Sequence, residues 1–287
     1  MALNGFQTIE VKQLSPALGA EVRGVDLSKA LDDRQWAEVH RAFLDHLVLF
    51  FPDQILTPEQ QIAFGRRFGT LNVHPYVKAL EGYPEVLDVR KEPQDEANFG
   101  GAWHADLTFL EQPPLGSVLY AKEVPDVGGD TMWCNLYLAY ETLSNGMKKL
   151  VEGLIGVHSA VMLYGSSKVG GTGFGGKMSM QVDQKDEAAQ EVEHPLVRTH
   201  PETGRKLLAI SPGYLRRLKD MSEEDSTPLL DQLRRHALRE VFTHRFHWSK
   251  NTVALWDNRC TLHYALNDYH GSRRRMFRVA INGDRPR

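Results

Sequence analysis

The chain has 287 residues, enough for a sizeable hydrophobic core, and we expect one domain over residues 1–287. Hydrophobic residues make up 41% and the formal net charge is −3, so the basic excess typical of nucleic-acid-binding proteins is missing. The apolar runs are too short to span a bilayer, and the start of the chain does not resemble a signal peptide. We therefore expect a cytoplasmic protein with neither nucleic acid nor membrane as partner.

The first part of the chain predicts strands and helices in alternation. Residues 19–27 alternate apolar and polar side chains as a half-buried strand does, and residues 36–44 place apolar side chains at helical spacing. The apolar run from Leu47 to Phe51 is typical of a buried strand. We expect a second helix to begin at Thr57, because Thr57 and Gln60 have the spacing of a capping box.

Residues 100–109, which read GGAWHADLTF, carry the most informative pair in the sequence. If this stretch is a β-strand, the side chains of His104 and Asp106 point to the same face, since residues i and i+2 share a face. Two histidines and one carboxylate with open positions are the ligand set of non-haem Fe(II) oxygenases. Taken alone, however, a His-x-Asp pair is more often a surface pair or a hydrogen bond at the end of a strand than a metal site.

The middle of the chain predicts two strands, a helix and a loop. We expect strands at 117–122 and 131–133, with the tight turn Gly128-Gly129-Asp130 before the second. Residues 136–154 are amphipathic and predict a helix. The glycine-rich stretch within 165–187 has no phosphate-loop Lys-Ser/Thr pair, and we interpret it as a flexible loop or lid.

The last third of the chain predicts one helix, at residues 227–236, and a series of strands. The expected strands lie at 194–200, 207–210, 244–248, 253–256 and 273–281. Short strands recurring at intervals of about ten residues, with a few helices between them, favour an all-β sandwich or a jelly roll, of which we expect the jelly roll. The predicted fold is therefore mainly β with flanking helices, a double-stranded β-helix. The two cysteines, Cys134 and Cys260, are too few for a disulfide framework, and we expect buried thiols.

A jelly roll brings its late strands beside its early ones, and this guides the choice of a third ligand among twelve histidines. His263 follows the turn at 257–259 and precedes a strand that carries Arg274 and Arg278. These two arginines are four residues apart, so they share a face and lie roughly 13 Å apart at ~3.3 Å per residue. Two guanidinium groups that point into a jelly roll need anionic partners.

Together these motifs resemble the taurine dioxygenase family of Fe(II)/2-oxoglutarate-dependent dioxygenases. The motifs are His104-Ala-Asp106, Gly128-Gly-Asp-Thr131, Trp256-Asp-Asn-Arg259, and His263 followed by Arg274 and Arg278. The similarity runs from about residue 19 to the C-terminus. Within the family, the chain looks most similar to aryloxypropionate herbicide dioxygenases and to alkylsulfatase-type members.

The resemblance implies a jelly roll that uses Fe(II), 2-oxoglutarate and O2. It implies His104, Asp106 and His263 as iron ligands, which makes them the catalytic centre. Thr131 and Arg274 would hold the distal carboxylate of 2-oxoglutarate. Arg278 would lie nearer the metal, in contact with the other carboxylate of the cosubstrate or with the anionic group of the substrate.

The resemblance also implies a substrate pocket, and the chain departs from the taurine dioxygenase pattern there. The residues that match the pocket are His74, Tyr76, Gly100, Tyr164, Tyr214 and Trp256, with Arg278. Gly100 stands where taurine dioxygenase has an asparagine for the amine, and Tyr164 and Tyr214 replace phenylalanines. These departures favour a larger acid than taurine: a longer sulfonate, a sulfate ester or an aryloxy acid.

The implied reaction hydroxylates a carbon next to a heteroatom of such an acid and releases succinate, CO2 and a carbonyl product. A jelly-roll metal hydrolase or isomerase that uses the same triad, with zinc and without 2-oxoglutarate, is the main alternative. A non-catalytic jelly-roll binding protein is a second alternative. We expect the chain to bind a small anionic molecule and to form a homo-oligomer.

Overall fold

The computed structural model describes residues 5–174 and 178–287. Within these ranges the strands are β1 (Glu10–Gln13), β2 (Ala20–Arg23), β3 (Val48–Phe51), β4 (Leu71–Asn72), β5 (Ala79–Leu80), β6 (Tyr83–Lys91), β7 (Gly116–Glu123), β8 (Thr131–Asn135), β9 (Ile155–Ser159), β10 (Glu191–Pro195), β11 (Val197–Thr199), β12 (Lys206–Leu208), β13 (Leu215–Leu218), β14 (Thr243–Phe246), β15 (Val253–Asp257), β16 (Thr261–Ala265) and β17 (Arg274–Ile281). The helices are α1 (Asp33–His46), α2 (Pro58–Arg66), α3 (Leu136–Glu141), α4 (Asn145–Val151), α5 (Val161–Tyr164), α6 (Glu223–Ala237) and the short 3-10 helices η1 (Ser167–Val169), η2 (Asp186–Ala189) and η3 (Glu240–Phe242).

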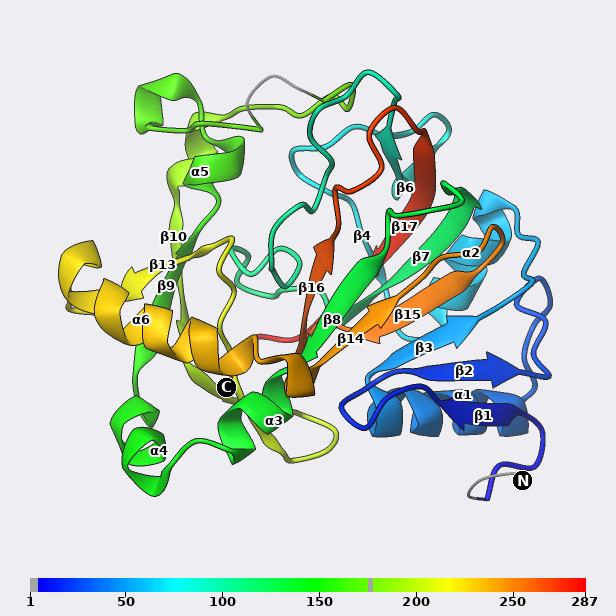
Figure 1. Ribbon diagram of the computed structural model, residues 1–287, viewed down its shortest axis with the longest axis horizontal. Helices are drawn as coiled ribbons and strands as arrows, with labels where there is room; N and C mark the ends of the chain where they lie inside the picture. The colour runs from blue at the N-terminus through cyan, green and yellow to red at the C-terminus, as the bar shows by residue number, and fades with distance from the viewer. Residues whose placement is uncertain (1–4, 175–177) are drawn as a thin grey trace.

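Two sheets form the jelly roll. Among the described residues, a nine-stranded sheet has the order β1-β2-β3-β15-β7-β17-β6-β5, with β4 beside β17, and a three-stranded sheet has the order β14-β8-β16. In Figure 1 the smaller sheet lies in the middle of the molecule, next to the larger one. Strands distant in sequence are neighbours, since β15 pairs with both β3 and β7. The predicted mainly β fold with flanking helices, a double-stranded β-helix, is confirmed.

The large sheet is buried on both faces, and this explains the unbroken apolar run that predicted β3. Leu49 and Phe51 belong to one core cluster, which also contains Phe43 of α1. Val48 and Phe50, which alternate with them, belong to the other core cluster inside the jelly roll. A strand between two apolar layers needs apolar side chains at every position. Burial of each such side chain contributes about 1.5–3 kcal/mol.

The helices α1 and α2 pack against the large sheet, and their starts follow from the sequence. Asp32 caps α1 by accepting a hydrogen bond from the backbone N–H of Gln35. At α2, the Thr57 hydroxyl accepts from the backbone N–H of Gln60, and the Gln60 side chain accepts from the backbone N–H of Thr57. The predicted capping box is confirmed.

The predicted helix over 136–154 is wrong as a single element, because the chain there forms α3 and α4 with a break between them. The break has a local cause. The Thr142 hydroxyl donates to the backbone carbonyl of Leu138 at 2.6 Å as α3 ends, and Ser144 caps the new helix by accepting from the backbone N–H of Met147. Serine and threonine compete with the helix for its own backbone groups, and an amphipathic pattern does not register this.

The glycine-rich stretch interpreted as a loop holds η1 and η2 in its described residues and pairs with an early segment. Val182 forms a bridge with Val77, and the backbone N–H of Asp183 donates to the carbonyl of Tyr76 at 2.7 Å. These contacts join the stretch to the segment that contains Tyr76 and Val77. Its opening and closing stay a prediction, and residues 175–177 lie outside the described residues.

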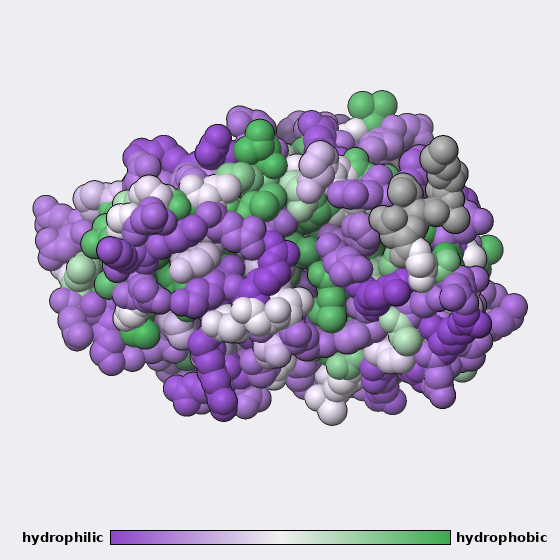
Figure 2. Space-filling model, turned by 90° about the horizontal axis from the view of Figure 1, so that it is seen from below, coloured by the Kyte–Doolittle hydropathy of each residue, from purple (hydrophilic) through white to green (hydrophobic). Residues whose placement is uncertain are grey.

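The exposed apolar residues of the described surface are scattered. In the view of Figure 2 hydrophobic residues lie in small groups among hydrophilic ones. The large apolar side chains that are exposed come from separate segments and include Ile55, Val127 and Val241. None of the described helices has both the length and the apolar character needed to cross a membrane.

Candidate active site

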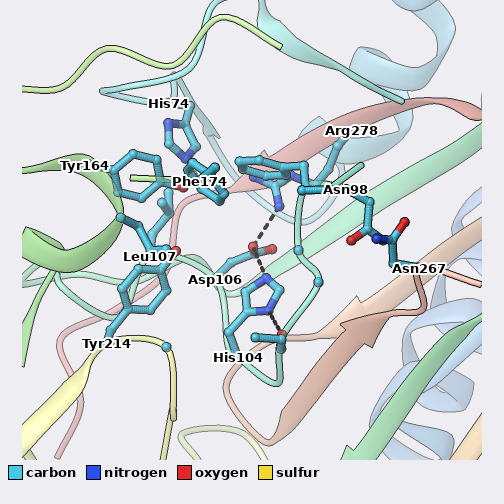
Figure 3. Close-up of a pocket in the computed structure, with 17 residues that line it drawn as sticks. His74, Asn98, His104, Asp106, Leu107, Tyr164, Phe174, Tyr214, Asn267 and Arg278 are labelled. Carbon is cyan, nitrogen blue, oxygen red and sulfur yellow. Dashed lines mark hydrogen bonds and ion pairs between the residues drawn. The ribbon is translucent and has the colours of Figure 1, made fainter. Parts of the chain in front are cut away.

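Three side chains that could bind a metal ion meet where β16 lies beside the loop that contains His104. The backbone N–H of His104 donates to the carbonyl of His263 at 3.0 Å, and the N–H of His263 donates back at 2.8 Å. The Oδ1 atom of Asp106 is 3.8 Å from the Nε2 atom of each imidazole. Figure 3 shows Asp106 beside His104, with both side chains directed into one cavity. The structure therefore brings together the three predicted ligands.

The route by which His104 and Asp106 meet differs from the prediction, because residues 100–109 do not form a strand. His104 makes an isolated bridge with His263, and a turn with a positive φ of 51° at Leu107 follows. Asp106 thus reaches the imidazoles from the start of a turn. The predicted proximity of His104 and Asp106 is therefore correct, but the predicted strand is wrong.

The protonation states suit a divalent cation. Burial lowers the pKa of both imidazoles and so favours the neutral forms of His104 and His263. The Nδ1–H of His104 donates to the carbonyl of Ala102 at 2.7 Å, which leaves the Nε2 lone pair free. Burial acts to raise the pKa of Asp106, but the guanidinium of Arg278 and the hydrogen bond from the Ser117 hydroxyl favour the charged carboxylate, and this pKa stays below its ordinary value. Two neutral imidazoles and one carboxylate fit Fe(II).

His263 is held differently from His104. Its Nδ1 atom is buried and has no hydrogen-bond partner in the described part of the chain. Its ring instead packs at a centroid distance of 4.8 Å against Trp256 of β15. The orientation of this imidazole is therefore set by packing and by the backbone bridge.

The two arginines of β17 have different surroundings. Arg278 donates from Nη1 to Oδ1 of Asp106 at 2.7 Å, so it neutralises the carboxylate of the triad. Arg274 is 5% exposed, and its Nε has no hydrogen-bond partner among the described residues. Among the described residues, its side chain makes one hydrogen bond, from Nη2 to the Thr131 hydroxyl at 3.4 Å, which is a long contact. A buried guanidinium without a carboxylate calls for an anionic ligand.

Thr131 is positioned by the turn that precedes β8. At Gly128, where φ is 80°, an added Cβ would lie 2.8 Å from the carbonyl oxygen of Asp268, so only glycine fits. Asp130 binds Arg245 at 2.6 Å and leaves Arg274 without a carboxylate. The turn thus delivers the Thr131 hydroxyl to Arg274 without bringing a competing negative charge.

Two connected cavities adjoin the triad. The smaller, of about 40 Å³, is lined by Thr131 and Arg274 together with Trp256 and His263. The larger has a volume of about 270 Å³ and contains Asp106. Both share a wall that consists of Phe99, Gly100, His104 and Arg278.

Most of the predicted pocket residues line the larger cavity, and two do not. Those that line it are His74, Gly100, Tyr164, Tyr214 and Arg278. Tyr76 instead stacks on Tyr164 at a centroid distance of 5.0 Å and supports it from behind. Trp256 lines the smaller cavity, so its place in the substrate pocket stays a prediction.

Sequence reasoning missed several residues that line the larger cavity. They are Ala97, Asn98, Phe99, Gly101, Ala102, Leu107, Leu163, Phe174, Gly213 and Asn267. Most of them lie in loops, where periodicity gives no signal. Phe174 was the one with a visible clue, because a large aromatic residue inside a glycine-rich stretch has little to pack against unless it covers a cavity.

His74 presents a fixed donor to the larger cavity. Its Nδ1 accepts hydrogen bonds from the backbone N–H groups of Tyr76 and Val77, at 3.1 and 3.2 Å, so the proton of the neutral ring is on Nε2. Burial lowers the pKa of His74 to about 3. The buried Nε2–H has no hydrogen-bond partner within the described residues. Figure 3 shows this ring on the same side of the cavity as Tyr164.

A second cluster of His200, Asp257 and Cys260 has metal-like spacing but different chemistry. The Nδ1 of His200 accepts two backbone N–H bonds, so its Nε2 carries the proton and donates to Asp257 at 3.0 Å. Arg259 also binds both oxygens of Asp257, at 2.9 and 2.6 Å. The imidazole of His200 and the carboxylate of Asp257 therefore have no free lone pair for a metal. Cys260 and Cys134 are buried free thiols, as predicted.

The triad predicts binding of a divalent cation by the purified protein. His104→Ala should weaken binding of Co(II) by at least about 100-fold, because it removes one of three ligands. His247→Ala, which removes an exposed imidazole outside both cavities, should leave binding unchanged. Isothermal titration with Co(II) would measure both variants. An unaltered Co(II) affinity in His104→Ala would rule out the triad.

The chain is similar to known proteins over most of its length. Among curated proteins, the chain is 35% identical to an alkylsulfatase of Acinetobacter baylyi, over 98% of this chain and 87% of the relative. It is 34% identical to an alpha-ketoglutarate-dependent sulfate ester dioxygenase of Pseudomonas putida, over 97% and 91%. A crystal structure of a taurine dioxygenase from Burkholderia xenovorans superposes with a TM-score of 0.82 at 37% identity, over 98% and 91%.

The family model that matches is described as taurine catabolism dioxygenase TauD, TfdA family, and it covers residues 10–280. The resemblance inferred from the sequence motifs is thereby confirmed. The chain belongs to the TauD/TfdA family of dioxygenases.

Proposed function

We propose that the protein uses Fe(II), 2-oxoglutarate and O2 to hydroxylate a carbon next to a heteroatom of a small organic acid, a sulfonate, a sulfate ester or an aryloxy acid. The relatives support this reaction class. The observation that carries the proposal is the pairing of a metal triad with two separate cationic sites, one at Arg274 and one at Arg278. One site suits the cosubstrate, and the other lies beside the substrate cavity.

The triad would hold Fe(II) through the Nε2 atoms of His104 and His263 and a carboxylate oxygen of Asp106. When bound, Fe(II) would let one molecule of O2 oxidise both 2-oxoglutarate, which gives succinate and CO2, and a C–H bond of the substrate, which becomes C–OH. Hydroxylation next to a sulfonate, sulfate or ether oxygen gives an unstable product. That product collapses to a carbonyl compound and releases sulfite, sulfate or a phenol.

Arg274 and Thr131 would bind the distal carboxylate of 2-oxoglutarate. The Trp248 indole N–H donates to the Thr131 hydroxyl oxygen at 2.9 Å, and Arg274 donates to the same oxygen. The hydroxyl proton of Thr131 is therefore free to point toward a ligand. A guanidinium and a hydroxyl donor in a buried pocket are well matched to a carboxylate.

The larger cavity would hold the prime substrate. His74 offers a neutral N–H donor, Arg278 supplies the positive charge, and Phe99 and Phe174 give apolar walls that exclude water. Gly100 has a φ of 78°, and an added Cβ would lie 3.3 Å from Cε1 of His104. The glycine therefore leaves space directly above a metal ligand, which favours an acid larger than taurine.

Two alternatives have less support. A metal hydrolase or isomerase with the same triad has no use for a carboxylate cradle such as Arg274 with Thr131, which lies in a cavity shared with His263. A binding protein without catalysis does not need neutral imidazoles with free Nε2 atoms. The cytoplasmic location, the homo-oligomer and the closing of the 165–187 loop stay predictions.

Succinate production tests the proposed reaction. With Fe(II), 2-oxoglutarate and O2, a panel of alkyl sulfates, alkylsulfonates and aryloxy acids should include at least one compound that stimulates succinate release and yields sulfate, sulfite or a phenol in equal amount. Coupled chromatography and ion analysis would measure both products. Release of sulfate or phenol without 2-oxoglutarate would favour a hydrolase.

The cosubstrate site predicts a selective effect on 2-oxoglutarate. Arg274→Ala should raise the KM for 2-oxoglutarate by about 10-fold to 100-fold, because a charge-assisted hydrogen bond contributes about 1.5–3 kcal/mol. Arg273→Ala, which removes the adjacent and 39% exposed arginine, is the matched control and should change this KM less than about twofold. Steady-state kinetics at saturating substrate would decide. Equal KM values in the two variants would show that Arg274 has another role.

The substrate site predicts a particular pH behaviour for His74. His74→Phe should raise the KM for the anionic substrate about tenfold through loss of the N–H donor. Because the pKa of His74 is about 3, the ring is neutral from about pH 5 to 8, and the ratio of the two KM values should stay constant over that range. A cationic histidine would instead lose its contribution as the pH rose through its pKa. A ratio that falls with rising pH would contradict the neutral donor.

A further inference from the structure

The backbone of Asp106 is held by a side chain from the turn between β15 and β16. Asn258 accepts the backbone N–H of Asp106 on its Oδ1 at 2.7 Å. Its Nδ2 donates to the backbone carbonyl of Asp106 at 3.0 Å and to that of Pro114 at 3.1 Å. Asn258 is 4% exposed, so its polar atoms are used where water is excluded. One asparagine thus fixes the position of the ligand residue against the start of β7.

The carboxylate of Asp106 has two unlike oxygens. Oδ2 accepts a hydrogen bond at 3.0 Å from the hydroxyl of Ser117, a residue of β7 with no exposed surface. Oδ1 faces the other way, at 3.8 Å from the Nε2 atoms of His104 and His263, and accepts from Arg278. In Figure 3 the contacts of Asp106 with His104 and Arg278 run from the same side of the carboxylate.

We propose that Ser117 is a positioning residue that makes Asp106 a metal ligand through Oδ1 alone. The inference rests on the proposed function, because it assumes that the triad binds the metal. With the backbone fixed by Asn258, the remaining freedom of Asp106 is rotation of its side chain. The Ser117 hydroxyl stops this rotation by holding Oδ2 away from the imidazoles.

This restraint matters for the number of coordination positions. A carboxylate that binds through both oxygens takes two positions of an octahedral ion, and one that binds through a single oxygen takes one. With two imidazoles and one carboxylate oxygen, three positions stay open for a bidentate keto acid and for O2. Ser117 therefore protects the last open position, although it contacts neither substrate nor metal.

A merely structural role for Ser117 makes a different prediction. Loss of the hydroxyl would then lower the stability of the fold and leave metal affinity unchanged. Ser226 of α6 provides the control, since it is equally buried and its hydroxyl is also hydrogen-bonded, to the N–H of Leu218 and to the carbonyl of Ser222. Ser226 lines neither of the two cavities at the triad.

The experiment is a titration of the full chain with Co(II), followed by calorimetry and by the visible absorption of the bound ion. Ser117→Ala should weaken Co(II) binding about 10-fold to 100-fold, the usual effect of losing a group that orients a ligand, and should shift the visible bands. Ser117→Cys, whose thiol is somewhat larger than the hydroxyl and donates only weakly, should shift both in the same direction. Ser226→Ala should bind Co(II) as the wild type does.

The outcomes separate this proposal from the proposed function. Wild-type affinity and wild-type bands in both Ser117 variants, with wild-type binding intact, would overturn the role of Ser117 and leave the triad standing. Absence of Co(II) binding by the wild-type protein, or wild-type affinity in His104→Ala, would overturn the triad itself. Thermal unfolding of each variant shows whether it is folded, and the Ser117→Cys protein carries the test if Ser117→Ala does not fold.

Discussion

Asp106 is a carboxylate that is 2% exposed, and a buried charge costs several kcal/mol unless it is paired. The structure meets this constraint with strands from distant parts of the chain. Arg278 on β17 supplies the positive charge, and Ser117 on β7 supplies a neutral donor. Since β7 and β17 pair directly, with Arg278 opposite Leu119, the register of this pair sets where both groups lie. The pairing of β7 with β17 therefore determines which groups stabilise the charge of Asp106.

The same sheet separates two positive charges that a simple charge count would treat alike. Arg274 and Arg278 share a face of β17, but within residues 5–174 and 178–287 only Arg278 has a carboxylate partner. Asp130 follows Gly129 in the sequence. It binds Arg245 and His247 rather than Arg274. The protein therefore keeps one buried guanidinium uncompensated. An unpaired buried charge destabilises a fold, and binding of a carboxylate ligand would remove this cost.

Much of the fold could be predicted because its signals are local. The capping box at Thr57 and the buried run at Leu47–Phe51 depend on neighbouring residues alone, and both are confirmed. The strand β6 gave no clear pattern, since its inner face ends in Lys91, a buried lysine 4.3 Å from the ring of Tyr269. Pairing with β17 rather than composition makes this segment a strand.

The site was predictable in membership more than in geometry. The motif residues His104, Asp106 and His263 do meet, but through a backbone bridge and a turn that no alternation rule describes. The Trp256-Asp-Asn-Arg259 motif shows why. The sequence predicts only a turn there. In the structure, the side chain of Asn258 accepts a hydrogen bond from the backbone N–H of Asp106, which is 152 positions away. The partner of Asn258 is thus a residue far away in the sequence. Its role can be recognised only when the pairing of the flanking strands, β15 and β16, is known.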